Sequence, residues 1–188
     1  MSHSRHAPRI LATRTLARTR LFHVEAVDLR FSNGEEVSYE RLVGNPAGAV
    51  LIVPLLDDET VLMIREYAAG VERYELALPK GRVEAGEDPL QAANRELKEE
   101  VGYGARELVP LCSLTLAPGY STHLTHIVLA RDLYPERLEG DEPEPIEVHP
   151  WSLSGLAELL AHPECTEARS IAALFLAREH LCKREACP

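Results

Sequence analysis

The sequence has no apolar run long enough to cross a bilayer. Its longest apolar stretch, residues 49–56 (AVLIVPLL), is far shorter than the roughly 20 residues that a transmembrane helix needs. No hydrophobic signal segment follows the N-terminus either. We therefore expect a protein without a membrane span.

Basic residues are in short supply. The chain of 188 residues has 20 Lys and Arg against 30 Asp and Glu, which gives a formal net charge of −10. Such a charge argues against generic binding to nucleic acid or to an anionic membrane. If the ligand is itself an anion, a cation has to be recruited to the site, and a divalent metal is the obvious candidate. We therefore expect neither nucleic acid nor a membrane as a partner.

Cysteine is also sparse. The four cysteines are scattered and include no C-x2-C pair: Cys112, Cys165, Cys182 and Cys187. This spacing suits neither a zinc site nor a disulfide framework, so a reducing, cytoplasmic environment is expected.

A chain of this length forms one domain, or one domain with a small appendage, and it can bury a sizeable core without disulfide bonds or structural metals.

Acidic residues are absent from the first twenty positions, which contain five arginines: Arg5, Arg9, Arg14, Arg18 and Arg20. An organellar transit peptide has this character, and so does a frayed basic arm or an edge strand. Several apolar residues in the same segment favour an arm or strand that is packed: Ile10, Leu11, Leu16 and Leu21.

Alternating apolar residues predict a β-hairpin over residues 24–42. The turn is Asn33-Gly34, the dipeptide most typical of a two-residue hairpin loop. Further strands are expected within three apolar segments: residues 49–67, 111–119 and 123–133. Helices are expected in three places: within residues 88–101, after Ser152, and through residues 166–181.

This order of elements favours an α+β fold in which a mixed β-sheet is sandwiched between α-helices. We expect residues 1–45 to form an N-terminal antiparallel β-hairpin arm and residues 46–188 to form the main domain. The acidic, proline-rich residues 139–148 (EGDEPEPIEV) should form an extended loop.

The central helix has clear start and stop signals. Asp88 is an N-cap residue followed by Pro89 at the first helical position and Gln91 at the third. Gly102 supplies the stop, because glycine tolerates the left-handed conformation that ends a helix. One apolar stripe should face the core: Leu90, Ala93, Leu97 and Val101.

Three glutamates gather on one side of this helix. At about 100° per residue, Glu96 and Glu100 stand one turn apart at the margin of the apolar stripe, and Glu99 lies on the adjoining ridge. Arg95 is near only Glu99 on the same wheel. Like charges one turn apart repel, whereas Mg²⁺ prefers such oxygen ligands. The helix alone leaves a metal site and a solvated acidic face as alternatives.

The glycine-led loop before the helix favours the metal site. Residues 81–103 resemble the Nudix box, G-x5-E-x7-R-E-U-x-E-E-x-G-U, where U is a bulky aliphatic residue. Its fixed positions are filled by Gly81, Glu87, Arg95, Glu96, Leu97, Glu99, Glu100 and Gly102. Only the last position departs, being Tyr103, and this is a packing position. The chain is thus identified as a member of the Nudix hydrolase superfamily.

The resemblance implies an enzyme that binds Mg²⁺, or Mn²⁺, and cleaves the pyrophosphate of a nucleoside diphosphate linked to another moiety. Glu96 and Glu100 then correspond to the principal metal ligands, with Glu99 as a third and the backbone carbonyl of Lys80 as another. The remaining box residues with a catalytic role are the pair that braces the loop against the helix, Glu87 and Arg95.

The similarity extends over residues 9–182. Segments such as FSNGEEVSYER, IREYAAGVERYEL and LYPERLEGDEPEP are similar to the bacterial ADP compounds hydrolases (NudE-type), close to the ADP-ribose pyrophosphatases. Those enzymes cleave ADP-ribose, NADH and diadenosine oligophosphates, releasing AMP or ADP. They are homodimers whose N-terminal strands cross to the partner. The resemblance therefore places the basic arm inside the mature protein and implies a homodimer.

Two features outside the box resemble the ADP-ribose pyrophosphatases. Pro118 lies sixteen residues past Gly102, as in that branch. The acidic loop resembles the loop that brings further glutamates to the metals, which makes Glu142 the general base and Glu144 an additional metal contact. A solvated linker remains the alternative for this loop.

Substrate contacts are expected from residues that flank the approach to the box. Arg65 and Arg73 are candidates for the phosphates, and Tyr67, Tyr74 or Tyr120 for stacking on adenine. Each has strand packing or ion pairing as its alternative. The main alternative function is another Nudix pyrophosphatase, acting on a nucleoside triphosphate or an RNA 5′ end. A non-catalytic ADP-ribose sensor is a third possibility, but here the box carboxylates are all present.

Overall fold

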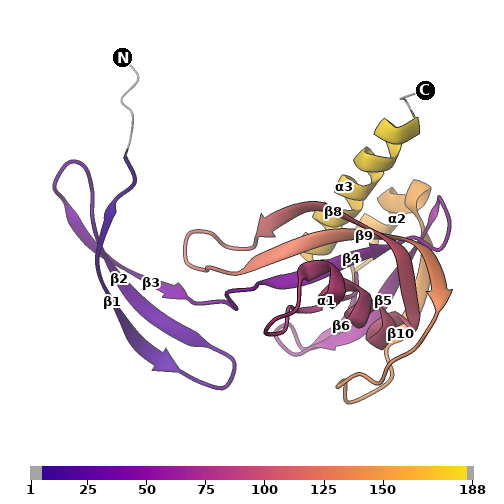
Figure 1. Cartoon of the computed structure of the whole chain (residues 1–188), viewed down its shortest axis with the longest axis horizontal. Helices are drawn as coiled ribbons and strands as arrows, with labels where there is room; N and C mark the ends of the chain where they lie inside the picture. Colours follow the sequence, from indigo (N-terminus) through magenta and orange to yellow (C-terminus); the bar gives the residue numbers. More distant parts are fainter. Residues whose placement is uncertain (1–5, 186–188) are drawn as a thin grey trace. The chain divides into compact units, whose positions relative to one another are not determined.

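The structure, a computed structural model, describes residues 6–185 and divides into two compact units (Figure 1). One unit comprises the chain up to Pro46 together with Thr115–Leu124. The other comprises Ala47–Leu114 and the chain from Thr125 onward. Arg5 and Cys187, which entered the sequence-based predictions, lie outside the described residues.

The N-terminal unit contains a three-stranded antiparallel sheet in the order β1-β2-β3. Its strands are β1 (Arg9–Arg18), β2 (His23–Arg30) and β3 (Glu36–Leu42). At the predicted hairpin turn, the Asn33 side chain accepts a hydrogen bond from the Glu35 N–H at 3.1 Å, and Gly34 has φ +90°. The hairpin and the antiparallel N-terminal module are confirmed. The basic arm is an edge strand.

The predicted packing of this arm is wrong for the single chain. Ile10 is 55% exposed and Leu21 is 64% exposed, and Leu11 and Leu16 are exposed as well. The reason is that β1 pairs only with β2, and the described part of this unit contains no helix that covers the sheet.

A segment far along the chain belongs to the same N-terminal unit. The Leu42 N–H donates to the Tyr120 carbonyl at 2.8 Å, and the Thr122 N–H donates to the Leu42 carbonyl at 3.0 Å. The segment Thr115–Leu124 therefore adds to the β3 end of the arm, and it carries both Pro118 and Tyr120.

The second unit is built on two sheets, ordered β7-β4-β9-β8 and β10-β5-β6. The strands are β4 (Ala49–Pro54), β5 (Thr60–Ala68), β6 (Arg73–Ala77), β7 (Lys80–Arg82), β8 (Tyr103–Thr115), β9 (Leu124–Pro135) and β10 (Glu147–Ser152). The helices are α1 (Pro89–Glu96), the π-helical turn η1 (Leu97–Val101), the 3-10 turn η2 (Leu153–Gly155), α2 (Leu156–Ala161) and α3 (Ala168–Glu185). β4 is parallel to β9 and antiparallel to β7, so the sheet is mixed and the α+β prediction is confirmed.

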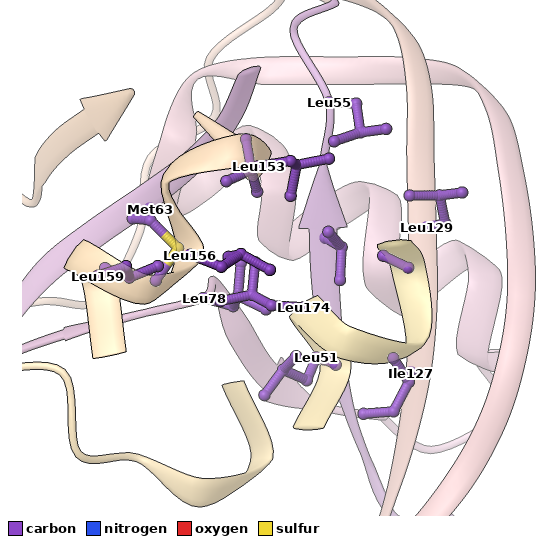
Figure 2. Close-up of a cluster of buried hydrophobic side chains, with 14 of the residues drawn as sticks. Leu51, Leu55, Met63, Leu78, Ile127, Leu129, Leu153, Leu156, Leu159 and Leu174 are labelled. Atoms are coloured by element: carbon purple, nitrogen blue, oxygen red, sulfur yellow. The ribbon is translucent and has the colours of Figure 1, made fainter. Parts of the chain in front are cut away.

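Strand β4 lies between two hydrophobic clusters. Leu51 and Val53 pack into a cluster with side chains of α2 and α3 (Figure 2). Val50 and Ile52 pack on the opposite face with side chains of α1 and η1. Successive residues of a strand point to opposite faces, so a strand buried on both faces is apolar throughout. This explains the unbroken AVLIVP run and confirms a sheet sandwiched between helices.

The helical segment made of α1 and η1 begins and ends at the residues that the sequence predicts. Asp88 accepts hydrogen bonds from the N–H groups of Leu90 and Gln91 at 2.8 and 3.1 Å, and the Gln91 side chain accepts from the Asp88 N–H. Gly102 ends the π-helical turn η1, which follows α1, at φ +83°.

The last turn differs from the prediction, because it is π-helical. The Gly102 N–H donates to the Leu97 carbonyl at 3.2 Å, five residues back. The wheel of about 100° per residue no longer applies past Leu97, since a π turn contains an extra residue. Glu100, expected at the margin of the apolar stripe, is buried, with 4% of its surface exposed.

Among residues 6–185, no helix has the length and apolar character needed to cross a membrane.

Candidate active site

A cavity of about 580 Å³ in the second unit brings together the box and the acidic loop. Of the predicted metal and catalytic residues, the lining includes Lys80, Arg95, Glu96, Glu99, Glu100 and Glu142. The other lining residues are Glu66, Gly81, Arg82, Glu84, Glu139, Gly140, Asp141 and Pro143. Eight of these fourteen residues are carboxylates, which makes the cavity strongly acidic.

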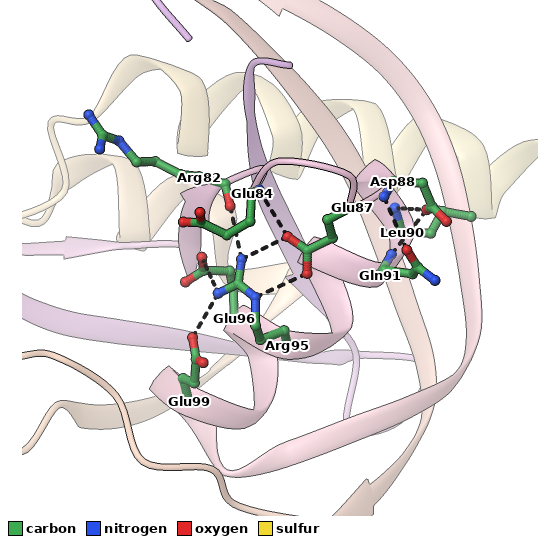
Figure 3. Close-up of polar contacts among 9 residues, drawn as sticks. All are labelled: Arg82, Glu84, Glu87, Asp88, Leu90, Gln91, Arg95, Glu96 and Glu99. Atoms are coloured by element: carbon green, nitrogen blue, oxygen red, sulfur yellow. Dashed lines mark hydrogen bonds and ion pairs between the residues drawn. The ribbon is translucent and has the colours of Figure 1, made fainter. Parts of the chain in front are cut away.

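Arg95 joins the loop to the helix (Figure 3). Its guanidinium donates to both oxygens of Glu87, each at 3.0 Å, and to the Arg82 carbonyl at 2.9 Å. It also donates to Glu96 at 2.8 Å and to Glu99 at 3.0 Å. The expectation from the helical wheel that Arg95 is near only Glu99 is therefore wrong, because the side chain of the adjacent Glu96 also turns to the guanidinium. Hydrogen bonds from Arg95 lower the pKa of Glu87.

Two carboxylates of the cavity are buried deeply enough to hold protons. Burial raises the pKa of Glu96 to about 7, although Arg95 opposes the shift. Burial raises the pKa of Glu100 to about 8, against the opposing charge and backbone N–H of Lys80. That N–H donates to Glu100 Oε2 at 2.8 Å. Strongly perturbed carboxylates in a cavity are characteristic of a functional site.

Two glycines make room for carboxylates of the site. A Cβ atom on Gly81 would overlap the carboxylate of Glu96, and one on Gly140 would overlap the carboxylate of Glu142. The first glycine of the box is therefore required by the close approach of Glu96 to the loop.

The donor set of this cavity fits a hard divalent cation. Its carboxylates supply oxygen ligands, which Mg²⁺ prefers. Within residues 6–185, no three His, Cys, Asp or Glu side chains are already gathered around one point as a ligand set. Glu96 and Glu99 each accept a hydrogen bond from Arg95 with one carboxylate oxygen, and a carboxylate has a second oxygen with which it can bind a cation.

A second cavity, of about 320 Å³, adjoins the first and shares three lining residues with it: Glu66, Glu142 and Pro143. It contains three of the predicted substrate residues, Arg65, Tyr67 and Tyr74. The rings of Tyr67 and Tyr74 meet edge to face at 5.5 Å. The acidic loop thus forms a wall of both cavities.

The remaining predicted site residues have other contacts. Arg73 donates to Glu75 at 2.6 Å and to Thr166 at 2.9 Å, which is the ion-pairing alternative. Glu144 accepts a hydrogen bond from the Tyr74 hydroxyl and lines the second cavity instead of the first. Tyr120 belongs to the N-terminal unit. The roles predicted for these residues stay predictions.

Glu66 lines both cavities and was not predicted. It pairs with Lys80, the two charged groups lying 3.0 Å apart. A signal was present in the sequence: β5 alternates, and Leu62 and Ile64 pack toward α1. The period of two puts Glu66 on the same face.

The raised pKa values predict how the stability of the metal-free protein depends on pH. Folding raises the pKa of Glu96 and of Glu100 above the ordinary value of 4.5, so both carboxylates bind protons more tightly in the folded state than in the unfolded state. Their contribution to stability is complete below about pH 4.5 and is lost as the pH rises through 7 to 8. In the presence of EDTA, we expect the Tm to be lower at pH 8.5 than at pH 5.5.

The Glu100→Gln variant tests the assignment, because it removes one of the two titrations. Thermal scans should show a flatter decline of Tm with pH in this variant, and Glu179→Gln on the exposed face of α3 should retain the wild-type decline. An equal decline in Glu100→Gln and the wild type would contradict the assignment.

Comparison with known proteins identifies the family. The NUDIX domain matches residues 45–175, and the NudE-type Nudix hydrolase N-terminal domain matches residues 8–41. The chain is 53% identical to ADP compounds hydrolase NudE of Escherichia coli (strain K12), over 96% of this chain and 97% of that protein. It is 30% identical to the ADP-ribose pyrophosphatase of Bacillus subtilis (strain 168), over 87% of this chain and 91% of that protein.

A solved structure described as the crystal structure of ADP compounds hydrolase superposes with a TM-score of 0.90 at 51% identity. The match covers 97% of this chain and 98% of that one. The sequence resemblance in the box is thus matched over nearly the whole fold. The chain belongs to the Nudix hydrolase family.

Proposed function

We propose that this chain hydrolyses the pyrophosphate bond of ADP-linked compounds such as ADP-ribose, NADH and diadenosine oligophosphates, releasing AMP or ADP in the presence of Mg²⁺. One observation carries the proposal: three box carboxylates, Glu96, Glu99 and Glu100, line the same cavity as Glu142 of the acidic loop. The similarity of the whole chain to an ADP compounds hydrolase supports this choice of substrates.

The proposed metal ligands are Glu96, Glu100, Glu99 and the carbonyl of Lys80. Mg²⁺, or Mn²⁺ in its place, would offset the charge of the diphosphate and lower the pKa of the attacking water. Burial of Glu96 and Glu100 supports their role, because a buried carboxylate gains most when a cation replaces its proton.

The remaining residues hold the site in place and move the proton. Glu142 is the proposed general base, since it lines the metal cavity at its boundary with the second cavity. Arg95 and Glu87 keep the loop against the helix through their paired hydrogen bonds.

The second cavity is the proposed place of substrate groups beyond the diphosphate. Tyr67 offers an aromatic face for a base, and Arg65 a cation beside it. Contacts from Arg73 and Tyr120 remain part of the proposal.

A substrate panel tests the proposed specificity. With Mg²⁺ present, ADP-ribose and NADH should yield AMP, measured by chromatography of the products, with kcat/KM at least about tenfold above that for dGTP. Turnover of dGTP alone, or of an RNA 5′ end alone, would replace the proposal by the other Nudix activity. Binding of ADP-ribose without turnover would favour the sensor.

Glu100→Gln tests the metal site. The substitution keeps the shape of the side chain but removes the charge that a divalent cation needs, so we expect a loss of Mg²⁺-dependent kcat/KM of about 100-fold or more. Circular dichroism should show a folded protein. An unchanged rate would exclude Glu100 as a metal ligand.

We further propose that the chain is a homodimer in the cytoplasm and that the N-terminal sheet forms the interface. The exposed apolar residues of β1, Ile10, Leu11 and Leu16, support this, because large apolar side chains that are exposed on one element are typical of an interaction site. The described cysteines are free, which suits a reducing compartment.

Sedimentation velocity tests the dimer. The wild type should sediment as a dimer, and the double variant Ile10→Asp/Leu16→Asp should shift to monomer, because two buried charges in an interface are costly. Leu160→Asp, at an exposed position on α2, is the control and should remain dimeric. A monomeric wild type at micromolar concentration would refute the proposal.

A further inference from the structure

The acidic loop between β9 and β10 is tied to the domain by a tyrosine. The Tyr74 hydroxyl donates a hydrogen bond to Glu144 Oε1 at 2.6 Å. Tyr74 lies on β6 and Glu144 lies seventy residues later, in the second half of the loop and three residues before β10. The loop is otherwise held at its start, where the Leu138 N–H donates to the Lys98 carbonyl at 3.2 Å, and at its end by β10.

Tyr74 is itself held on both sides. The Arg65 guanidinium lies over its ring, 4.3 Å from the centroid, and Tyr67 meets it edge to face. Arg65 in turn donates two hydrogen bonds to Glu164, each 2.9 Å long, and lies 3.5 Å from Glu147. A ring fixed in this way is a stable anchor for a loop.

The loop transmits this anchoring to Glu142 because it is stiff. Glu142 and Glu144 each precede a proline, in the sequence Glu142-Pro143-Glu144-Pro145. Proline fixes its own φ and restricts the residue before it to extended conformations. A carboxylate fixed at Glu144 therefore leaves Glu142 little freedom.

We propose that Tyr74 is a positioning residue: through its hydrogen bond to Glu144 it holds Glu142 at the metal cavity, and Glu144 serves as the anchor of the loop and not as a metal ligand. The inference rests on the proposed function of Glu142 as the general base. In this proposal the hydroxyl of Tyr74 holds the loop, whereas its ring contributes aromatic surface to the second cavity.

Tyr74→Phe tests the anchor, because it keeps the ring under Arg65 and removes only the hydroxyl. We expect kcat for ADP-ribose to fall about five- to tenfold, the effect of one lost hydrogen bond, with KM and the Mg²⁺ concentration for half-maximal rate unchanged. Tyr103→Phe is the matched control: it removes a tyrosine hydroxyl from a ring that packs against the α1 cluster, and its kcat should equal that of the wild type.

A double-mutant cycle separates positioning from a general structural effect. If Tyr74 acts through Glu142, adding Tyr74→Phe to Glu142→Gln should cost no further activity, whereas independent effects would multiply. Wild-type kcat in Tyr74→Phe, or the same fold loss in both backgrounds, overturns the anchor. Wild-type kcat in Glu142→Gln instead overturns the general base assigned under the proposed function.

Substitutions of Glu144 separate anchoring from metal binding. Glu144→Gln still offers an oxygen to the Tyr74 hydroxyl and should retain most of kcat, whereas Glu144→Ala should lose as much as Tyr74→Phe. Both should keep the wild-type Mg²⁺ dependence. A raised Mg²⁺ requirement in Glu144→Gln would show that Glu144 is a metal ligand and would overturn the proposal.

Discussion

The guanidinium of Arg95 counters the repulsion among the carboxylates of the site. Glu87, Glu96 and Glu99 all point to it, and its hydrogen bond to the Arg82 carbonyl holds the loop in place. Like charges this close would otherwise drive the loop from the helix. The hydrogen bond from Arg95 thus helps to hold the Glu96 carboxylate in the space that Gly81 leaves free.

The position of this loop and helix depends in turn on β4. Because both faces of β4 are apolar, α1 packs on one side while α2 and α3 pack on the other. β4 also pairs with β7, which begins at Lys80, so the strand that supports the core also sets the start of the box. The site thus lies next to β4, a strand that is buried along its whole length.

Local chemistry made much of this predictable from the sequence. The cap at Asp88, the stop at Gly102 and the turn at Asn33-Gly34 depend on neighbouring residues alone, and the structure contains all three. The π turn was missed because it depends on one backbone bond that a regular wheel excludes. The bonds of Arg65 to Glu164 were equally out of reach, because they join residues ninety-nine positions apart and so depend on the packing of the whole domain.

The hydrogen bonds between Leu42 and the segment of residues 115–124 have a consequence for the evolution of the chain. The NudE-type N-terminal domain matches one continuous segment, residues 8–41, yet the compact unit also contains Thr115–Leu124, the segment between β8 and β9. A gene fusion that carried only the first 45 residues would leave the N–H and the carbonyl of Leu42 without their backbone partners, Tyr120 and Thr122. The arm therefore folds with all its backbone hydrogen bonds only when the β8–β9 tip is present, although the two segments lie more than seventy residues apart in the chain.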